Sequence, residues 1–255
     1  MRETRKARLD VLLVERGLVS SRERARSLIL AGRVSVDAAV VSKAGTLVTR
    51  SADIRLAEPD HPFVGRGGVK LAYALERFGL AVAGRTALDI GASTGGFTDA
   101  LLQGGASRVV ALDVGHGQID WTLRNDPRVV VLERVNARHL RPDQLPADVG
   151  QVDIVTIDVS FISLVHILPV VPPLLAPAAD VLVLVKPQFE AGRREVGRGG
   201  VVRDPDVQAR VVGEISTAAD ALALATIGSC ESPIQGADGN REFFLHVRMR
   251  SRHVS

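Results

Sequence analysis

The chain has 255 residues, of which 46% are hydrophobic and 24% are charged, and these values are ordinary for a soluble globular protein. This length allows one large domain or two modest ones with a sizeable core. Cys230 is the only cysteine, which excludes an internal disulfide and is typical of a protein of the reducing cytoplasm. With no metal-ligand spacing around it, Cys230 is interpreted as a packing residue.

Positive charge is concentrated near the N-terminus. Residues 1–70 hold fourteen Lys or Arg and eight Asp or Glu, whereas the whole chain has a net charge of only +3. Charge placed this unevenly favours a polyanionic partner, nucleic acid before membrane.

A membrane-spanning segment is not expected. Residues 1–8 are basic, but no apolar signal segment follows them. The longest apolar tract, residues 164–185, is interrupted by four prolines and by His166 and Asp180. It predicts a loop and a proline-started helix that lead into a buried strand at 181–185.

The N-terminal region predicts two short helices followed by small β segments. Leu9, Leu12 and Leu13 form the apolar stripe of the first helix, which ends near Gly17. Ser20 and Glu23 have the spacing of a capping box for the second helix. Its apolar face is formed by Ala25, Leu28 and Ile29, and short alternating segments follow it up to Ile54.

These phrases resemble the alpha-L RNA-binding fold of a ribosomal protein. The resemblance covers about residues 7–57 and depends on the sequence segments that begin at Arg8 and Ser21. It implies an RNA-binding domain at 1–60, then a linker at 61–66. Without it, arginines on a helix usually form a solvated face. The candidate RNA-binding residues are Arg8, Arg22, Arg24, Arg26, Arg33 and Arg66.

Residues 86–97 predict the first strand, glycine turn and helix of a doubly wound α/β sheet. The apolar run 86–90 has strand length, and Gly91, Gly95 and Gly96 allow a tight turn close to a ligand. Sheets of this kind bind ligands at the carboxyl ends of their strands. A glycine turn in some other α/β protein is the alternative.

The spacing of these glycines does not match the G-x-G-x-x-G fingerprint of dinucleotide-binding proteins, and no lysine opens the helix for a phosphate. Asp113 ends the next apolar run, 108–112, where it could hold ribose hydroxyls. Glycines and a ribose-binding acid without a phosphate site favour S-adenosylmethionine.

Further along the chain the pattern alternates between strands and helices. Strands are predicted at 108–113, 129–133, 153–157 and 181–185, and helices at 97–104, 117–124 and 205–224. A glycine- and arginine-rich loop, 189–203, is either an RNA contact or a solvated loop. A terminal hairpin, 226–233 and 242–249, would complete a seven-stranded sheet.

Four charged residues stand at the edges of these elements. Lys70 is placed at the start of a helix, an unfavourable position for a cation, and Asp158 and Lys186 end two strands. Glu242 enters the last strand. Any one of them could be a solvated strand end, but four at one edge of a sheet indicate chemistry.

Together these four residues resemble the Lys-Asp-Lys-Glu set of the FtsJ-like ribose 2′-O-methyltransferases, and the whole chain resembles the TlyA family. The phrases that carry this likeness begin at Gly65, Leu88, Asp158, Val185 and Gly239. The resemblance implies methylation of cytidine in ribosomal RNA within ribosomal subunits, with S-adenosylmethionine as cofactor, no metal and a cytoplasmic location. Its catalytic domain would span 67–255.

The resemblance also implies roles for individual residues. Lys186 would be the base, Lys70 would supply a neighbouring positive charge, and Asp158 and Glu242 would orient the two lysines. Asn136 lies where an acidic residue often contacts adenine. Asp89 would support the glycine loop from behind. The candidate cofactor-binding residues are Asp89, Gly91, Ser93, Thr94, Gly95, Gly96, Phe97, Asp113 and Asn136.

Several other functions are weighed against this one. Amino-group methylation typically uses Asn/Asp-Pro-Pro-Tyr where this chain has Asp158-Val-Ser-Phe. Pyrimidine C5 methylation needs a cysteine nucleophile, and Cys230 lies away from the expected strand end. Methylation of a small molecule would leave the basic front domain unexplained. A membrane-active haemolysin and an RNA-binding module with an inactive methyltransferase fold are the alternatives from other classes.

Overall fold

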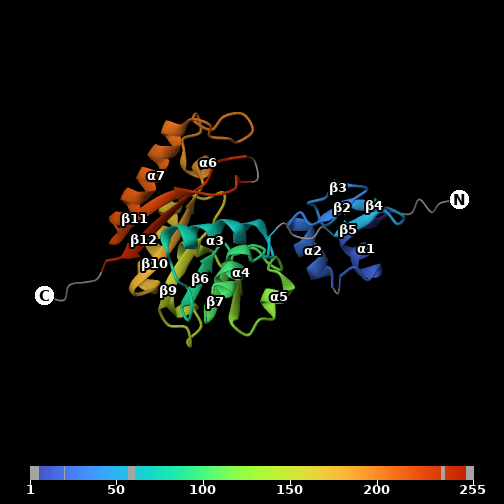
Figure 1. Ribbon diagram of the computed structural model, residues 1–255, viewed down its shortest axis with the longest axis horizontal. Helices are drawn as coiled ribbons and strands as arrows, with labels where there is room; N and C mark the ends of the chain where they lie inside the picture. Colours follow the sequence, from blue (N-terminus) through green and yellow to red (C-terminus); the bar gives the residue numbers. More distant parts are fainter. Residues whose placement is uncertain (1–5, 20, 57–60, 237–238, 251–255) are drawn as a thin grey trace.

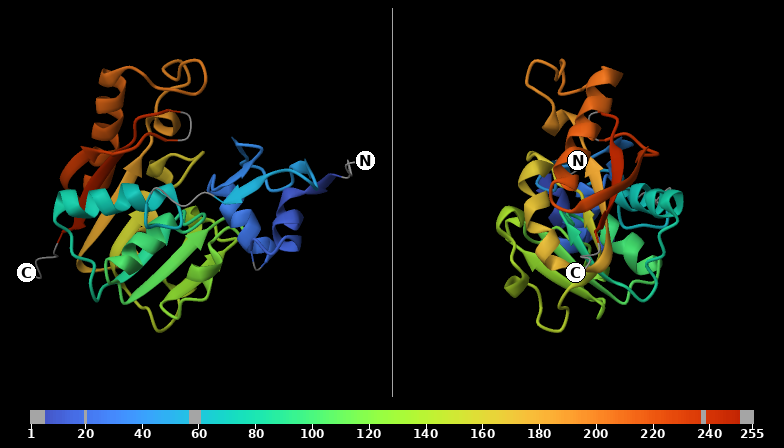
Figure 2. Two further views of the ribbon diagram at one scale, coloured as in Figure 1. Left: turned by 45° about the vertical axis from the view of Figure 1, so that its right-hand side comes forward. Right: turned by 90° about the vertical axis from the view of Figure 1, so that its left-hand side faces the viewer.

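The computed structural model describes residues 6–19, 21–56, 61–236 and 239–250. Figures 1 and 2 show a small N-terminal domain at one end of the molecule and a larger C-terminal domain built on a twisted sheet. The N-terminal domain is described here over residues 6–56, and the C-terminal domain over residues 61–250 with its gap at 237–238.

The N-terminal domain packs two helices against two small groups of strands. The strands pair as β1–β4 and as a three-stranded sheet in the order β3-β2-β5. The apolar stripes predicted for both helices face one buried core, which includes Leu9, Leu13 and Ile29. The elements are β1 (Lys6–Arg8), α1 (Leu9–Glu15), α2 (Arg22–Leu30), β2 (Val34–Val36), β3 (Ala39–Val40), β4 (Leu47–Thr49) and β5 (Ile54–Leu56).

The start of α2 differs from the prediction. Ser20, the predicted first residue of the capping box, lies outside the described residues, and the residue that caps α2 is Ser21. Its hydroxyl accepts a hydrogen bond from the backbone N–H of Arg24 at 3.1 Å. A serine hydroxyl at this position satisfies one of the free N–H groups in the first turn of the helix.

The C-terminal domain has one seven-stranded sheet, as predicted, and its strands lie in the order β11-β12-β10-β9-β6-β7-β8. The strands from β10 to β8 along this order run parallel, and β12 is antiparallel to both β10 and β11. The strands are β6 (Thr86–Ile90), β7 (Arg108–Asp113), β8 (Val129–Glu133), β9 (Val152–Ile157), β10 (Leu175–Val185), β11 (Leu224–Glu231) and β12 (Phe243–Met249).

Both faces of this sheet are covered, because successive side chains along a strand point to opposite faces. Along β10, Val181, Val183 and Val185 enter one apolar core, whereas Leu182 and Leu184 enter the other. The first core also receives side chains of α7, and the second receives side chains of α3 and α4 (Figure 1). The helices are α3 (Arg66–Phe78), α4 (Gly96–Gln103), α5 (Trp121–Arg124), α6 (Pro187–Glu190) and α7 (Pro205–Asp220).

Three predicted helices were wrong in length or kind. Residues 117–120 are not helical, so only α5 remains of the helix predicted at 117–124, and α7 ends at Asp220 rather than at 224. The proline-rich tract forms short 3₁₀ turns instead of a helix, because proline lacks a backbone N–H and favours helix starts over helix interiors. These turns are η3 (Leu164–His166), η4 (Leu168–Val170) and η5 (Pro172–Leu174), after which β10 begins earlier than predicted. Among the described residues, no helix combines the length and apolarity needed to cross a bilayer.

The two domains contact each other through Asp120, whose side chain is almost fully buried. Arg24 of α2 forms an ion pair with this carboxylate, and the Ser27 hydroxyl donates to it at 3.4 Å. The backbone N–H of Asp120 in turn donates to the carbonyl of Thr94 at 3.0 Å. The N-terminal domain is thereby attached beside the glycine turn after β6.

Gly91 occupies a position that excludes any side chain. Its φ of +86° is a left-handed conformation, and a Cβ there would lie 2.3 Å from the backbone oxygen of Asp158. Gly84 has a similar φ of +74° but open space around it. We expect Gly91→Ala to lower the free energy of unfolding by about 2–5 kcal/mol, through backbone strain and overpacking together.

The matched control is Gly84→Ala, which should cost only the backbone strain of about 1–2 kcal/mol. Urea denaturation followed by far-UV circular dichroism measures both values. Equal losses in the two variants would show that the contact with Asp158 has no energetic consequence.

Candidate active site

A pocket of about 530 Å³ opens at the carboxyl ends of β6, β7 and β9. Gly91 and Ser93 of the glycine turn form one wall, and Asp113 and Asn136 form another. The segment that follows β9, from Asp158 to Ile162, lines the remaining side. The pocket therefore lies where open α/β sheets bind their ligands.

Asp113 holds the glycine turn in shape while facing this pocket. One carboxylate oxygen accepts the backbone N–H of Ser93 at 2.8 Å, and the other accepts the N–H of Gly115 at 2.6 Å. Ser93 has a left-handed φ of +49°, which turns its N–H toward Asp113. Each carboxylate oxygen has more than one lone pair, so both can still accept hydrogen bonds from ribose hydroxyls.

Four of the predicted cofactor-binding residues line the pocket, and the other five do not. Gly91, Ser93, Asp113 and Asn136 are on the wall. The Asn136 side chain also accepts the backbone N–H of Arg138 at 3.1 Å, which fixes the orientation of the amide.

Thr94, Gly95, Gly96 and Phe97 serve the packing of the turn. Gly95 directly precedes α4 and has a φ of +96°, and a Cβ there would meet Leu123 at 2.2 Å. Phe97 is buried and stacks on Phe244 with 6.0 Å between ring centroids. Thr94 lies against the N-terminal domain, in a smaller cavity with Leu30 and Arg66. A direct contact of these four residues with a cofactor stays a prediction.

Asp89 is fully buried beneath the turn. Its two carboxylate oxygens accept hydrogen bonds from the hydroxyls of Thr98 at 2.7 Å and Thr156 at 2.9 Å. Burial raises the pKa of Asp89 to about 7, with a smaller contribution from the charge of Asp158. The residue links α4 and β9 to β6 and so supports the turn from behind.

The four predicted catalytic residues form two ion pairs. Lys70 Nζ lies 2.5 Å from Glu242 Oε2, and Lys186 Nζ lies 2.5 Å from Asp158 Oδ1. Both lysines are at least nine-tenths buried. A buried ammonium group is stable only when an acidic partner offsets its desolvation, and each lysine has one.

The strand register explains why these pairs share one edge of the sheet. Val185 of β10 lies opposite Phe243 of β12, so Lys186 and Glu242 are the next residues beyond that pair. Asp158 directly follows β9, the parallel neighbour of β10. The sheet therefore places three of the four charges, and Glu242 joins the fourth, Lys70, to them.

The position of Lys70 differs from the prediction. Lys70 is the fifth residue of α3, not its first, because the helix begins at Arg66. The interaction of the Lys70 charge with the positive end of the helix is therefore less unfavourable than predicted. Among the residues that the structure describes, no group of three or more His, Cys, Asp or Glu side chains could hold a metal ion.

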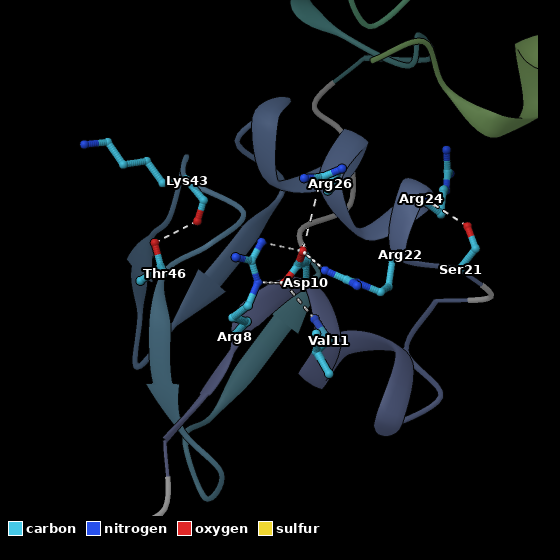
Figure 3. Close-up of polar contacts among 9 residues, drawn as sticks. All are labelled: Arg8, Asp10, Val11, Ser21, Arg22, Arg24, Arg26, Lys43 and Thr46. Atoms are coloured by element: carbon cyan, nitrogen blue, oxygen red, sulfur yellow. Dashed lines mark hydrogen bonds and ion pairs between the residues drawn. The ribbon is translucent and has the colours of Figure 1, made fainter. Parts of the chain in front are cut away.

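Three of the predicted RNA-binding arginines surround one buried carboxylate, that of Asp10 (Figure 3). Arg8 and Arg22 lie 2.9 and 3.0 Å from its Oδ2 atom, and Arg26 lies 3.9 Å from it. The hydrogen bonds from Arg8 and then from Arg22 lower the pKa of Asp10 to about 2. We call these three arginines and Asp10 the arginine cluster; the three arginine side chains remain about half exposed.

The other three predicted RNA-binding arginines lie elsewhere. Arg24 is paired with Asp120 at the domain contact, and burial together with the nearby charge of Arg33 lowers the pKa of Arg24. Arg66 donates to the backbone oxygen of Gln235 at 3.1 Å. Arg24 is therefore a structural residue of the interdomain contact in this arrangement.

No sequence pattern singles out Ser160 or Phe161, although both line the pocket. Ser160 accepts a hydrogen bond from Lys186 Nζ at 2.9 Å. Phe161 is 91% exposed and has a left-handed φ of +65°. Both residues belong to the sequence segment that begins at Asp158. Their contacts at the pocket are made with Lys186 and Phe189, which are distant in the sequence.

Protein-family models match both domains. A model described as FtsJ-like methyltransferase matches residues 63–249, and one described as S4 domain matches residues 7–54. The 16S/23S rRNA (cytidine-2′-O)-methyltransferase TlyA of Mycobacterium tuberculosis is 48% identical over 97% of this chain and 91% of its own length. The chain belongs to the TlyA family of FtsJ-like methyltransferases.

Other members of the TlyA family carry a different name. Hemolysin A of Brachyspira hyodysenteriae is 38% identical over 94% of this chain and 98% of its own length. The solved structure of a putative hemolysin from Streptococcus thermophilus has a TM-score of 0.74 and 40% identity, with 96% of this chain and 89% of that chain covered. The predicted family and the two-part α/β architecture are thus confirmed.

The raised pKa of Asp89 in this TlyA-family protein predicts a pH-dependent stability. The folded state holds a proton on Asp89 up to about pH 7, whereas the unfolded chain releases it near the ordinary value of 3.8. Stability from this group is therefore present at low pH and is lost as the pH rises toward 7. Relative to Asp89→Asn, the wild type should lose on the order of a few kcal/mol between about pH 4 and pH 7.

Asp10→Asn is the control with the opposite sign. Because the pKa of Asp10 is lowered, its contribution is present above about pH 4 and is lost as the pH falls toward 2. Denaturant titrations across this range give both difference curves. A flat Asp89 difference curve would contradict the assignment.

Proposed function

We propose that this protein is an S-adenosylmethionine-dependent methyltransferase that methylates the ribose 2′-hydroxyl of ribosomal RNA. The observation that carries the proposal is the pair of buried lysine–carboxylate ion pairs at the carboxyl edge of the sheet, beside the glycine-turn pocket. The family to which the chain belongs, and the printed names of its relatives, support the same reaction class.

The residues around the pocket fit S-adenosylmethionine. Gly91 lines the pocket beside Asp113, and the Asp113 carboxylate offers acceptors for two ribose hydroxyls. Asn136 and Val114 also line the pocket, and they are the residues proposed to hold the adenine ring. When bound, this cofactor supplies a methyl group attached to a positively charged sulfur.

The chain itself has to activate the hydroxyl. A ribose hydroxyl is a poor nucleophile, so a base must take its proton as the methyl group transfers. Lys186 is the proposed base because it lies at the pocket edge, paired with Asp158, whose carboxylate orients it. Glu242 offsets the charge of Lys70 and holds its ammonium group in place. The repulsion between Lys70 and Lys186 is thereby reduced.

The arginine cluster is proposed to bind the RNA backbone. Three guanidinium groups share a single carboxylate there, so the cluster keeps a net positive charge, and about half of each arginine side chain faces solvent. Asp10 arranges the guanidinium groups, and their remaining N–H donors are free to bind phosphate oxygens. Contacts of this kind make affinity fall as the salt concentration rises.

Phe161 is proposed to hold the target nucleotide. Phe161 is 91% exposed at the rim of the pocket, and its ring lies 5.1 Å from that of Phe189, so its free face is open to a base. Aromatic rings on single-stranded RNA-binding surfaces stack on unpaired bases. Stacking on Phe161 would place the ribose of that nucleotide near Lys186.

The finer identity of the substrate follows the relatives. The named activity of the Mycobacterium tuberculosis relative is methylation of cytidine in 16S and 23S rRNA. We propose cytidine within ribosomal subunits as the substrate here too, which agrees with the cytoplasmic location that the sequence predicts.

Lys186→Ala and Lys186→Arg should both abolish methyl transfer, lowering the rate by about 10²–10⁴-fold. Arginine keeps the positive charge but cannot give up a proton, so the arginine variant separates charge from proton acceptance. Transfer of labelled methyl groups to purified ribosomal subunits, mapped by nuclease digestion and mass spectrometry, measures the rate and the site.

Cofactor binding by calorimetry serves as the control for folding in both variants. A Lys186→Arg protein that still methylates at the wild-type rate would rule out Lys186 as the base. A methyl group found on a base atom instead of the 2′-oxygen would overturn the reaction class.

Phe161→Ala should lower kcat/KM for ribosomal subunits by about 5–150-fold, since stacking of one base on an aromatic ring contributes about 1–3 kcal/mol. Phe161→Trp should retain most activity. Val165→Ala, which shortens another exposed apolar side chain nearby in sequence, is the matched control and should have little effect. Equal kcat/KM values in the wild type and Phe161→Ala would exclude the stacking role.

A further inference from the structure

The hydroxyl of Ser160 is a second partner of the proposed base that the mechanism above does not use. Lys186 Nζ donates to Ser160 Oγ at 2.9 Å, and the carboxylate of Asp158 lies 2.5 Å from the same nitrogen. Ser160 is on the exposed side of the pocket, whereas Lys186 is buried. The lysine nitrogen is thus held between one charged and one neutral oxygen.

We propose that Ser160 is a positioning residue that aims the lone pair of Lys186 at the ribose hydroxyl. A neutral amine has two N–H donors and one lone pair in a tetrahedral arrangement. Ser160 accepts one N–H, and the Asp158 carboxylate, in ion-pair contact with the nitrogen, attracts the other, which leaves the lone pair the remaining direction. This inference rests on the proposed function, and in particular on Lys186 as the base.

The reaction is balanced with Ser160 unchanged. The ribose O–H bond breaks, and its proton adds to the Lys186 lone pair. The 2′-oxygen forms the new bond to the methyl carbon, and the carbon–sulfur bond breaks with its electron pair left on sulfur. Ser160 accepts an N–H of Lys186 before and after this step, so it guides the base without exchanging a proton.

The segment that carries Ser160 is anchored to the segment that carries Lys186. Glu190 of α6, four residues after Lys186, accepts the Ser163 hydroxyl at 2.6 Å and the backbone N–H of Leu164 at 2.8 Å. The rings of Phe161 and Phe189 make a second contact between the same two segments. Two contacts on one side of the Lys186–Ser160 bond therefore keep the donor and the acceptor at a fixed separation.

If Ser160 only stabilised its own turn, its hydroxyl would have a different hydrogen-bond partner. A serine in a turn usually bonds a backbone group two or three residues away. Ser160 Oγ instead reaches a side chain 26 residues away, and Ser163 makes the local bond, to the N–H of Val165 at 3.3 Å. Ser163 makes the hydrogen bond within the turn, besides its bond to Glu190, whereas Ser160 bonds to the lysine.

The test compares Ser160→Ala with Ser160→Thr. Alanine removes the acceptor and should lower kcat about 10-fold, as expected for a base that is present but poorly directed, with KM for subunits and for the cofactor within about twofold of wild type. Threonine keeps a hydroxyl and should restore most of kcat. Ser216→Ala, which removes a 2.8 Å hydroxyl bond on α7, is the matched control and should change neither constant.

A second measurement uses the free protein and needs no RNA. The exchange of Lys186 Nζ protons with water, followed by ¹⁵N NMR, should be faster in Ser160→Ala and close to wild type in Ser160→Thr. The chain has only four lysines, and the signal of Lys186 is the one missing in Lys186→Arg.

The outcomes separate this inference from the proposed function. Unchanged kcat or unchanged Nζ exchange in Ser160→Ala would overturn the positioning role, as would a threonine variant as impaired as the alanine variant. A wild-type protein that transfers no methyl group to ribosomal subunits would instead overturn the proposed function, whatever the exchange measurement shows.

Discussion

The structure depends on the pairing of two buried lysines with two carboxylates at one edge of the sheet. An unpaired ammonium group at this depth would destabilise the fold, because its desolvation is not offset. The register of β10 and β12 places Lys186 and Glu242 side by side, and β9 brings Asp158 to the same edge. Strand pairing, which is set by the apolar residues of the sheet, therefore also fixes the positions of the proposed catalytic charges.

The N-terminal domain uses the same physical solution for a different purpose. Asp10 is buried, and the three arginines around it offset its charge while keeping part of their surfaces in water (Figure 3). Their role inside the protein and their proposed role toward RNA are compatible, since a guanidinium group has five donors and Asp10 engages only some of them. Asp10 already restricts the arginine side chains in the free protein. They would therefore lose less conformational entropy on binding RNA.

Local patterns were enough to predict the strands and the glycine turn, but not the contacts between distant segments. The strands at 86–90 and 129–133 have the predicted bounds, because each is an apolar run with clear ends. The 3₁₀ turns after Leu164 and the short α5 were missed, since tertiary packing overrides weak helical patterns. Ser160 was missed for a related reason: its partner lies 26 residues away, and a serine alone indicates nothing about a lysine.

The approach of α3 to α4 explains how Lys70, which is not on the sheet, reaches Glu242. A Cβ on Gly96 would lie 2.9 Å from the backbone nitrogen of Gly68 and 3.1 Å from the Cα of Gly67, so the two helix starts touch through backbone atoms. A side chain at Gly96 would push α3 outward and draw the Lys70 ammonium away from its carboxylate. Glu242 would then be a buried anion without its partner, which is more costly than the loss of the helix contact itself. The glycines before Lys70 are therefore part of the charge balance of the site, although none of them carries a charge.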